Sequence, residues 1–141
     1  MLRPIFLVTF ILLCAVTSTQ AQSAAVKNQI LNRIIQLGAI TRAEVNERGG
    51  TDRILNIQSV DLNRDGKPEY LVNCECSPDG MPFVFRKTTK GVKELFVGEV
   101  RSTLTLAKGY TNGWRNLDWE AGNSPGFQGQ PLRFNGSRYQ K

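Results

Sequence analysis

The stretch that decides the fold is ILNIQSVDLNRDGKPEYLVNCEC, Ile54 to Cys76. Its two ends, Ile54–Val60 and Glu69–Cys76, are short runs rich in aliphatic, β-branched and aromatic residues, which is typical of strands. A polar loop with a glycine separates the two runs, and such residues favour a tight turn. The stretch therefore predicts two strands joined by a turn, and the rest of the chain can be read outward from it.

Similar runs follow along the chain, separated by clusters of Gly, Pro, Asn and Asp. We expect further strands near Pro82–Lys87, Val92–Val100, Ser102–Ala107, Trp114–Trp119, Leu132–Phe134 and Ser137–Gln140. The segment KTTKG (Lys87–Gly91) predicts one hairpin turn, and Asn135-Gly136 predicts another.

Upstream of the strands, apolar residues recur every three or four positions over Ser23–Leu37. This spacing predicts an amphipathic helix with Ser23 as its N-cap and Gly38 as its stop. A polar connector, Thr41–Asp52, follows and could form a short helical turn around Ala43–Asn46. A helix followed by a run of strands predicts an α+β fold, an N-terminal helix packed on one curved, mostly antiparallel sheet of about six to eight strands.

The N-terminal residues have the layout of a secretory signal peptide. Arg3 precedes an apolar run from Ile5 to Val16, and small and polar residues then lead to Ala21. The run is shorter than the roughly 20 residues that a membrane span needs. A retained anchor is the alternative. We expect a signal peptide over residues 1–21, one α+β domain over residues 22–141, and a periplasmic or secreted protein with no membrane span after processing.

The loop after the first strand has oxygen-bearing groups at alternate positions. The side chains of Asp61, Asn63, Asp65 and Glu69 stand at loop positions one, three, five and nine. The backbone carbonyl of Lys67 stands at position seven. Calcium takes six to eight oxygens, often from alternate loop positions. The loop is no EF-hand, because Val72 stands where that motif has its closing glutamate. We expect a structural calcium site that pins the two strands together. An Asx-rich turn that closes on its own backbone without an ion is the alternative.

The motif VDLNRDGKPEYLV (Val60–Val72) resembles the calcium loops of FG-GAP and VCBS repeats. A single copy cannot build a propeller, which takes about four blades or more. Over more of its length, with GWRNLDW (Gly113–Trp119) and LRFNGSRY (Leu132–Tyr139), the chain resembles small exported bacterial proteins of unknown role. The resemblance implies an α+β fold and an exported protein, and it does not imply any particular activity.

Cys74 and Cys76 are disulfide candidates, because export leads to an oxidising compartment and residues two apart on a strand point the same way. A buried pair of thiols is the alternative, and a soft-metal site would lack ligands. The chain has no histidine, which excludes Ser-His and Cys-His nucleophiles and the usual zinc hydrolase sites. A hydrolase using Asp118 and Glu120, or a C-x-C redox protein, is the alternative function.

The chain carries 18 basic and 12 acidic residues and a net charge of +6, which favours anionic partners. We expect no nucleic-acid partner, because export would remove the chain from nucleic acid. Recognition could use a surface of Tyr110, Trp114, Arg115 and Trp119, since such residues are common at binding hot spots. The alternative places them in the core. The glycine-rich loop Gly122–Pro131 is a second candidate. We expect an exported noncatalytic binding module that recognises a protein, including an enzyme it could inhibit, or an anionic envelope polymer.

Overall fold

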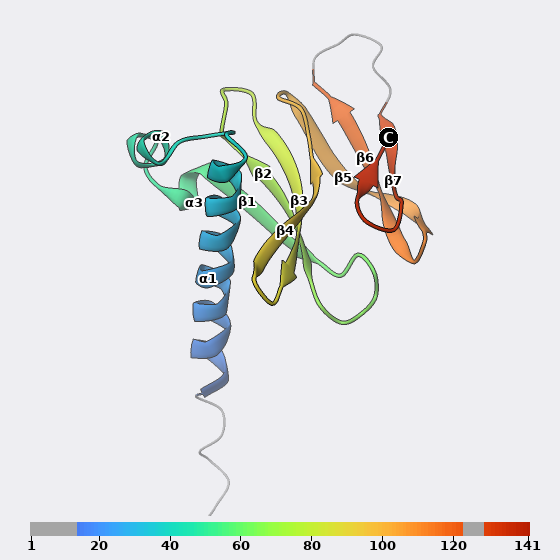
Figure 1. The fold of residues 1–141 in the computed structure, drawn as a ribbon, viewed down its shortest axis with the longest axis horizontal. Coiled ribbons are helices and arrows are strands. Elements are labelled where there is room, and N and C mark those ends of the chain that lie inside the picture. Colours follow the sequence, from blue (N-terminus) through green and yellow to red (C-terminus); the bar gives the residue numbers. More distant parts are fainter. Residues whose placement is uncertain (1–13, 123–128) are drawn as a thin grey trace, which may run out of the picture.

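A computed structural model describes the backbone of residues 14–122 and 129–141, and the side chains from residue 24 onward within these ranges. Within these ranges, three helices precede eight strands, most of which are labelled in Figure 1. The helices are α1 (Cys14–Gln36), α2 (Arg42–Glu47) and α3 (Thr51–Ile54). The strands are β1 (Leu55–Val60), β2 (Glu69–Cys74), β3 (Met81–Thr88), β4 (Gly91–Val97), β5 (Ser102–Thr111), β6 (Trp114–Ala121), β7 (Gln130–Phe134) and β8 (Tyr139–Gln140).

The fold is α+β, as predicted, but the single sheet of about six to eight strands is wrong. The strands form two four-stranded antiparallel sheets, β1-β2-β3-β4 and β5-β6-β7-β8, called here the first and the second sheet. The break lies between β4 and β5, where strand Val92–Val100 was predicted to continue. Gly98 lies so close to β3 that a Cβ atom, if a larger residue supplied one at this position, would lie 2.5 Å from Cγ of Pro82. Arg101 then takes a positive φ of 65°, and the chain leaves the first sheet.

The first sheet is the middle of three layers (Figure 1). One of its faces, with Val72 and Phe83, packs in a single core cluster with Ile30 of α1. The opposite face, with Leu71 and Val84, packs in another cluster with residues of the second sheet. Because side chains alternate between the faces of a strand, covering both faces requires a continuous apolar run. The segment PFVF, residues 82–85, is such a run and is buried throughout.

Most element boundaries agree with the sequence within a few residues. The hairpins close with Thr88 opposite Gly91 and Phe134 opposite Tyr139, as predicted. The first helix begins at Cys14 rather than Ser23, so the predicted cleavage site after Ala21 lies within it. Among the described residues, no helix is long and apolar enough to span a bilayer.

The predicted polar connector between helix and strand contains two short helices. The turn expected around Ala43–Asn46 is α2, and Thr41 and Glu44 form its capping box. The short helix α3 was not predicted, and it takes in Ile54, which had been assigned to the first strand. Its first turn follows Gly50, whose φ of 93° only glycine adopts readily.

Candidate functional site

The loop between β1 and β2 closes on its own backbone. The N–H of Gly66 donates to Oδ2 of Asp61 (2.9 Å), and the N–H of Lys67 donates to Oδ1 of Asp65 (2.8 Å). The N–H of Asp65 is shared by Oδ1 of Asp61 (3.2 Å) and Oδ1 of Asn63 (3.1 Å). The glycine adopts a φ of 80°, which gives the sharp turn that the sequence predicted. Asp61, Asn63 and Asp65 are therefore brought together on the inside of the loop.

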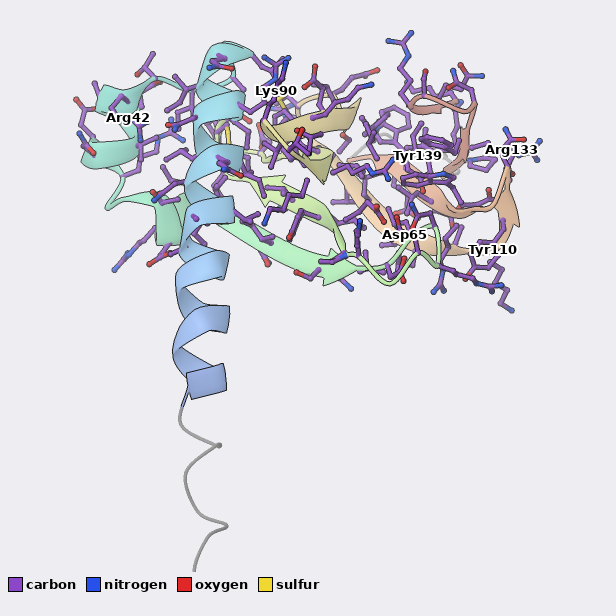
Figure 2. The ribbon with its side chains drawn as sticks, turned by 60° about the horizontal axis from the view of Figure 1, so that its bottom comes forward. Arg42, Asp65, Lys90, Tyr110, Arg133 and Tyr139 are labelled. Atoms are coloured by element: carbon purple, nitrogen blue, oxygen red, sulfur yellow. A yellow bond between two sulfur atoms is a disulfide. The ribbon has the colours of Figure 1, made fainter. Side chains whose placement is uncertain are left out.

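The same loop joins the two sheets, which sequence reasoning did not find. Leu62 is fully buried within the second core cluster, although it stands in a polar loop. The N–H of Arg115 in β6 donates to the carbonyl of Leu62 (2.7 Å). The guanidinium of Arg64 lies 3.9 Å from the ring centroid of Tyr110 in β5, and Figure 2 shows Asp65 and Tyr110 on these neighbouring segments. The loop is thus a junction between sheets as well as a turn within one.

Glu69 is the buried acid of this junction, with 1% of its surface exposed. Its Oε2 accepts the N–H of Leu62 (2.9 Å). Arg86, opposite Glu69 in β3, lies between acids: its Nε is 4.0 Å from Oε1 of Glu69, and its Nη2 is 3.6 Å from Oδ2 of Asp65. The same guanidinium lies 5.5 Å from the ring centroid of Trp114.

Burial raises the pKa of Glu69 above its usual range, and the nearby carboxylates of Asp65 and Asp61 raise it further. The Leu62 N–H and the positive charge of Arg86 act in the opposite direction. The pKa of Asp65 is lowered, chiefly by the N–H of Lys67. The loop therefore holds Asp65, whose pKa is lowered, at its rim and the desolvated Glu69, whose pKa is raised, at its base.

The loop residues fit an oxygen site for a cation in part. A carboxylate oxygen that accepts one N–H keeps a further lone pair, so Asp61, Asn63 and Asp65 can still offer oxygens to an ion. Glu69 points instead toward Leu62 and Arg86. Within residues 14–122 and 129–141, no three His, Cys, Asp or Glu side chains are grouped as metal ligands. A calcium ion here would depend on the amide of Asn63 and the carbonyl of Lys67 as well as on carboxylates.

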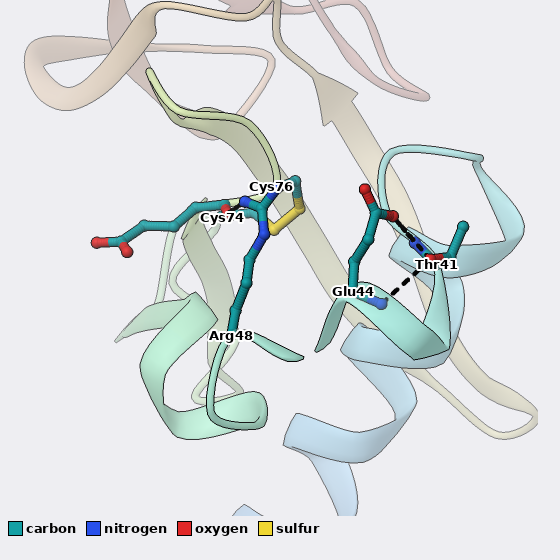
Figure 3. Close-up of a disulfide and its surroundings, with 6 residues drawn as sticks. Thr41, Glu44, Arg48, Cys74 and Cys76 are labelled. Atoms are coloured by element: carbon teal, nitrogen blue, oxygen red, sulfur yellow. Dashed lines mark hydrogen bonds between the residues drawn. A yellow bond between two sulfur atoms is a disulfide. The ribbon is translucent and has the colours of Figure 1, made fainter. Parts of the chain in front are cut away.

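Cys74 and Cys76 form the predicted disulfide, with 5.1 Å between their Cα atoms. Figure 3 shows the bridge beside α2. Arg48 reaches across and donates from Nη1 to the carbonyl of Glu75 (2.8 Å), the residue between the two cysteines. Both cysteines are buried. Because thiol exchange requires access to a sulfur, this placement supports a structural bridge rather than the C-x-C redox protein.

The proposed recognition surface of Tyr110, Trp114, Arg115 and Trp119 is not one surface. Both tryptophans lie in the second core cluster, 8% and 3% exposed. Trp114 stacks on Phe134, with 4.1 Å between ring centroids. Tyr110 is exposed, and Arg115 is half-buried with its Nε donating to the carbonyl of Ala107 (3.1 Å). The aromatic residues therefore belong mainly to the core, which was the alternative.

The acidic pair considered for hydrolysis lies on β6, on the strand face opposite to that of the buried Leu117 and Trp119. Asp118 is half-buried, opposite Thr105 and Pro131, and Glu120 is exposed, opposite Thr103. The glycine-rich loop Gly122–Pro131 falls largely outside the described residues. Nothing described around these acids resembles a substrate cleft.

A cleft that sequence reasoning missed lies between α1 and one end of the first sheet. It has a volume of about 1050 Å³, and Lys27, Ile57, Ser59, Lys67, Tyr70 and Lys87 are among its lining residues. The residues come from a helix, three strands and two loops. Only the basic run around Lys87 could have indicated it from sequence.

Comparison of the chain with protein-family models, curated proteins and solved structures gave no match. Function is therefore to be argued from the chain's own residues.

Proposed function

We propose that the protein is an exported, noncatalytic binding module that recognises an anionic polymer of the cell envelope, and that the loop Asp61–Glu69 holds a structural calcium ion. The observation that carries recognition is a group of exposed lysines that form no ion pair with any described residue. We call it the lysine surface: Lys67 in the β1–β2 loop, and Lys87, Lys90 and Lys93 in the β3–β4 hairpin.

All four lysines are exposed, and none makes an ion pair within the part of the chain that the structure describes. Some other basic side chains are neutralised, as in the pairs Arg33–Glu94 (2.7 Å) and Arg101–Asp79 (2.7 Å), whereas Lys108 and Arg138 of the second sheet and its hairpin form no ion pair with described residues. Unpaired like charges on one hairpin create a positive potential that attracts polyanions. By the register of β3 and β4, Lys87 and Lys93 lie on opposite faces of the hairpin, and Lys90 lies in the turn between the strands. A polymer chain that wraps the hairpin could contact them in succession, which a single small anion could not.

Replacing Lys90 and Lys93 by glutamine is expected to weaken binding to dextran sulfate about fivefold, which corresponds to roughly 1 kcal/mol for two exposed charges. The physical reason is the loss of two unpaired cations from the lysine surface. Biolayer interferometry on the immobilised polymer measures it, and higher salt should reduce the binding of the wild type because exposed charges are screened.

The matched control is Lys108→Gln with Arg138→Gln, which removes the same charge from exposed positions of the second sheet and its hairpin. Equal losses for both double variants would show that net charge alone attracts the polymer and would contradict a defined surface. Shortening of the polymer during the measurement would contradict the noncatalytic part of the proposal.

Calcium is expected to stabilise the metal-stripped protein with a dissociation constant of about 10⁻⁴–10⁻³ M, the range of extracellular modules. At ten times that concentration the gain is about 1.4 kcal/mol, visible as a rise in Tm and as heat in a calorimetric titration. Asp61 and Asp65 would hold the ion with Asn63, and Glu69 is the proposed ligand with the least support.

The variant Asp61→Asn should lose the calcium response, whereas Asp79→Asn, an exposed acid paired with Arg101, should keep it. The absence of both heat and a Tm shift at 10 mM calcium (a concentration about tenfold above the weakest expected constant) would remove calcium from the proposal. The loop would then be the backbone-closed turn alone.

A further inference from the structure

The cleft between α1 and the first sheet combines an apolar wall with a cationic rim. Val26 of α1 and Ile57 of β1 face it, and Tyr70 of β2 lies beside them. Ile57 and Tyr70 remain half-exposed, although they stand on the sheet face that packs against α1. The helix therefore leaves this end of the apolar face uncovered.

Lys67 and Lys87 stand at the rim of the cleft, and neither forms an ion pair with any described residue. The hydroxyl side chains of Ser59, Thr88 and Thr89 line it as well. The third rim lysine, Lys27, is already paired with Asp52. A ligand in the cleft would thus meet two available ammonium groups and hydroxyl donors at one place and hydrocarbon at another. Glu69 and Arg86 also line the cleft and are paired with each other (4.0 Å).

We propose that this cleft binds a single-chain anionic amphiphile, with its phosphate or carboxylate group at Lys67 and Lys87 and its alkyl chain along Val26, Ile57 and Tyr70. The volume of about 1050 Å³ is at the upper end for small-ligand sites, which usually have a mostly apolar wall and a few polar groups that fix orientation. Charge complementarity selects an anionic head, because a neutral amphiphile leaves both lysines without a counter-charge.

The proposal does not depend on polymer recognition, although two lysines are shared with the lysine surface. Lys90 and Lys93 belong to that surface but do not line the cleft. Ser59, in contrast, lines the cleft, is exposed and lies outside the lysine surface. Variants at these positions therefore separate the two activities.

Isothermal titration of the full mature chain with dodecyl phosphate, below its micelle concentration, is the test. We expect one molecule bound per chain. We expect the variant Lys67→Gln with Lys87→Gln to bind about tenfold more weakly. Ser59→Trp, which fills the cleft from an exposed position, should abolish binding. Lys90→Gln with Lys93→Gln should leave dodecyl phosphate binding within about twofold of the wild type while weakening dextran sulfate binding.

Two further probes identify the part of the ligand that is recognised. Inorganic phosphate should bind far more weakly than dodecyl phosphate, because it cannot use the apolar wall, and dodecyl maltoside should bind weakly, because it has no charge. Equal binding of inorganic phosphate, equal binding of dodecyl maltoside, or unchanged binding by Ser59→Trp would each overturn the proposal. Failure here with retained dextran sulfate binding would leave the proposed polymer recognition standing.

Discussion

Leu62→Ala is expected to lower the free energy of unfolding by about 3–5 kcal/mol, the upper part of the range for a leucine truncated in a core. Leu62 has 0% of its surface exposed and shares a core cluster with Trp114, Leu117 and Leu132 of the second sheet. Truncation removes apolar contacts and leaves a cavity where the two sheets meet. Because the same loop carries the backbone bond from Arg115, loosening the loop also weakens that bond.

Urea denaturation followed by tryptophan fluorescence measures the effect, because Trp114 lies in the same cluster. The control is Leu37→Ala, at a leucine with 36% of its surface exposed after the end of α1, where a loss below about 1 kcal/mol is expected. Similar losses for both variants would show that the loop does not anchor the second sheet to the first.

Much of the fold follows from local sequence patterns. Alternating and continuous apolar runs predicted every strand, because burial on one or both faces of a sheet dictates them. The two hairpins were also predicted from local residues, Asn135-Gly136 and the segment Lys87–Gly91, because a glycine in a turn readily takes the positive φ that the turn needs. The spacing of Cys74 and Cys76 likewise suggested a short-range bridge, although β2 ends at Cys74 and Cys76 lies in the turn that follows rather than on the predicted strand.

The division into two sheets could not be predicted in this way, because it depends on contacts between residues far apart in the chain. Val92–Val100 contains no proline to end the strand. The N–H of Gly98 still donates to the carbonyl of Pro82 (2.8 Å), and the chain turns away only near Arg101, which has a positive φ. Whether Trp114 lies in the core or on a recognition surface could not be decided from the sequence for a related reason. Its place in the strand does not reveal that the β7–β8 hairpin covers it with Phe134 and Tyr139.

The candidate site shows the same limit. The oxygen pattern of Asp61, Asn63 and Asp65 could be read from spacing, and the structure brings these residues together. The burial of Leu62 and Glu69 could not, since the residues around Leu62 in the loop are polar and a glutamate is almost never fully buried unless it is paired. The cleft was missed because it requires knowing which end of the sheet α1 leaves uncovered.

Glu69→Gln is expected to change how stability depends on pH. Glutamine can still accept the N–H of Leu62, but it has no charge to desolvate. In the wild type, burial raises the pKa of Glu69 above its ordinary value of 4.5, with Asp61, Asp65 and Arg86 as the charged groups around it. The folded protein therefore binds a proton more readily than the unfolded chain, and ionised Glu69 reduces stability at neutral pH.

As the pH falls through the folded pKa toward 4.5, the wild type should gain stability relative to Glu69→Gln, by about 1.4 kcal/mol for each unit by which the pKa is raised. Below that window the difference should be constant. Urea denaturation of the calcium-free protein at several pH values between neutral and 4 (roughly the unfolded value of a carboxyl group) measures this difference in stability.

Glu94→Gln is the control, for which the pH dependence should have the opposite sign. The hydrogen bond from Arg33 lowers the pKa of Glu94, so ionised Glu94 stabilises the fold above the unfolded value, and acid removes that contribution. A wild-type advantage over Glu69→Gln that shrinks on acidification would mean that Arg86 and the Leu62 N–H outweigh burial at this carboxylate, and that the junction between the sheets is held by a stabilising charge.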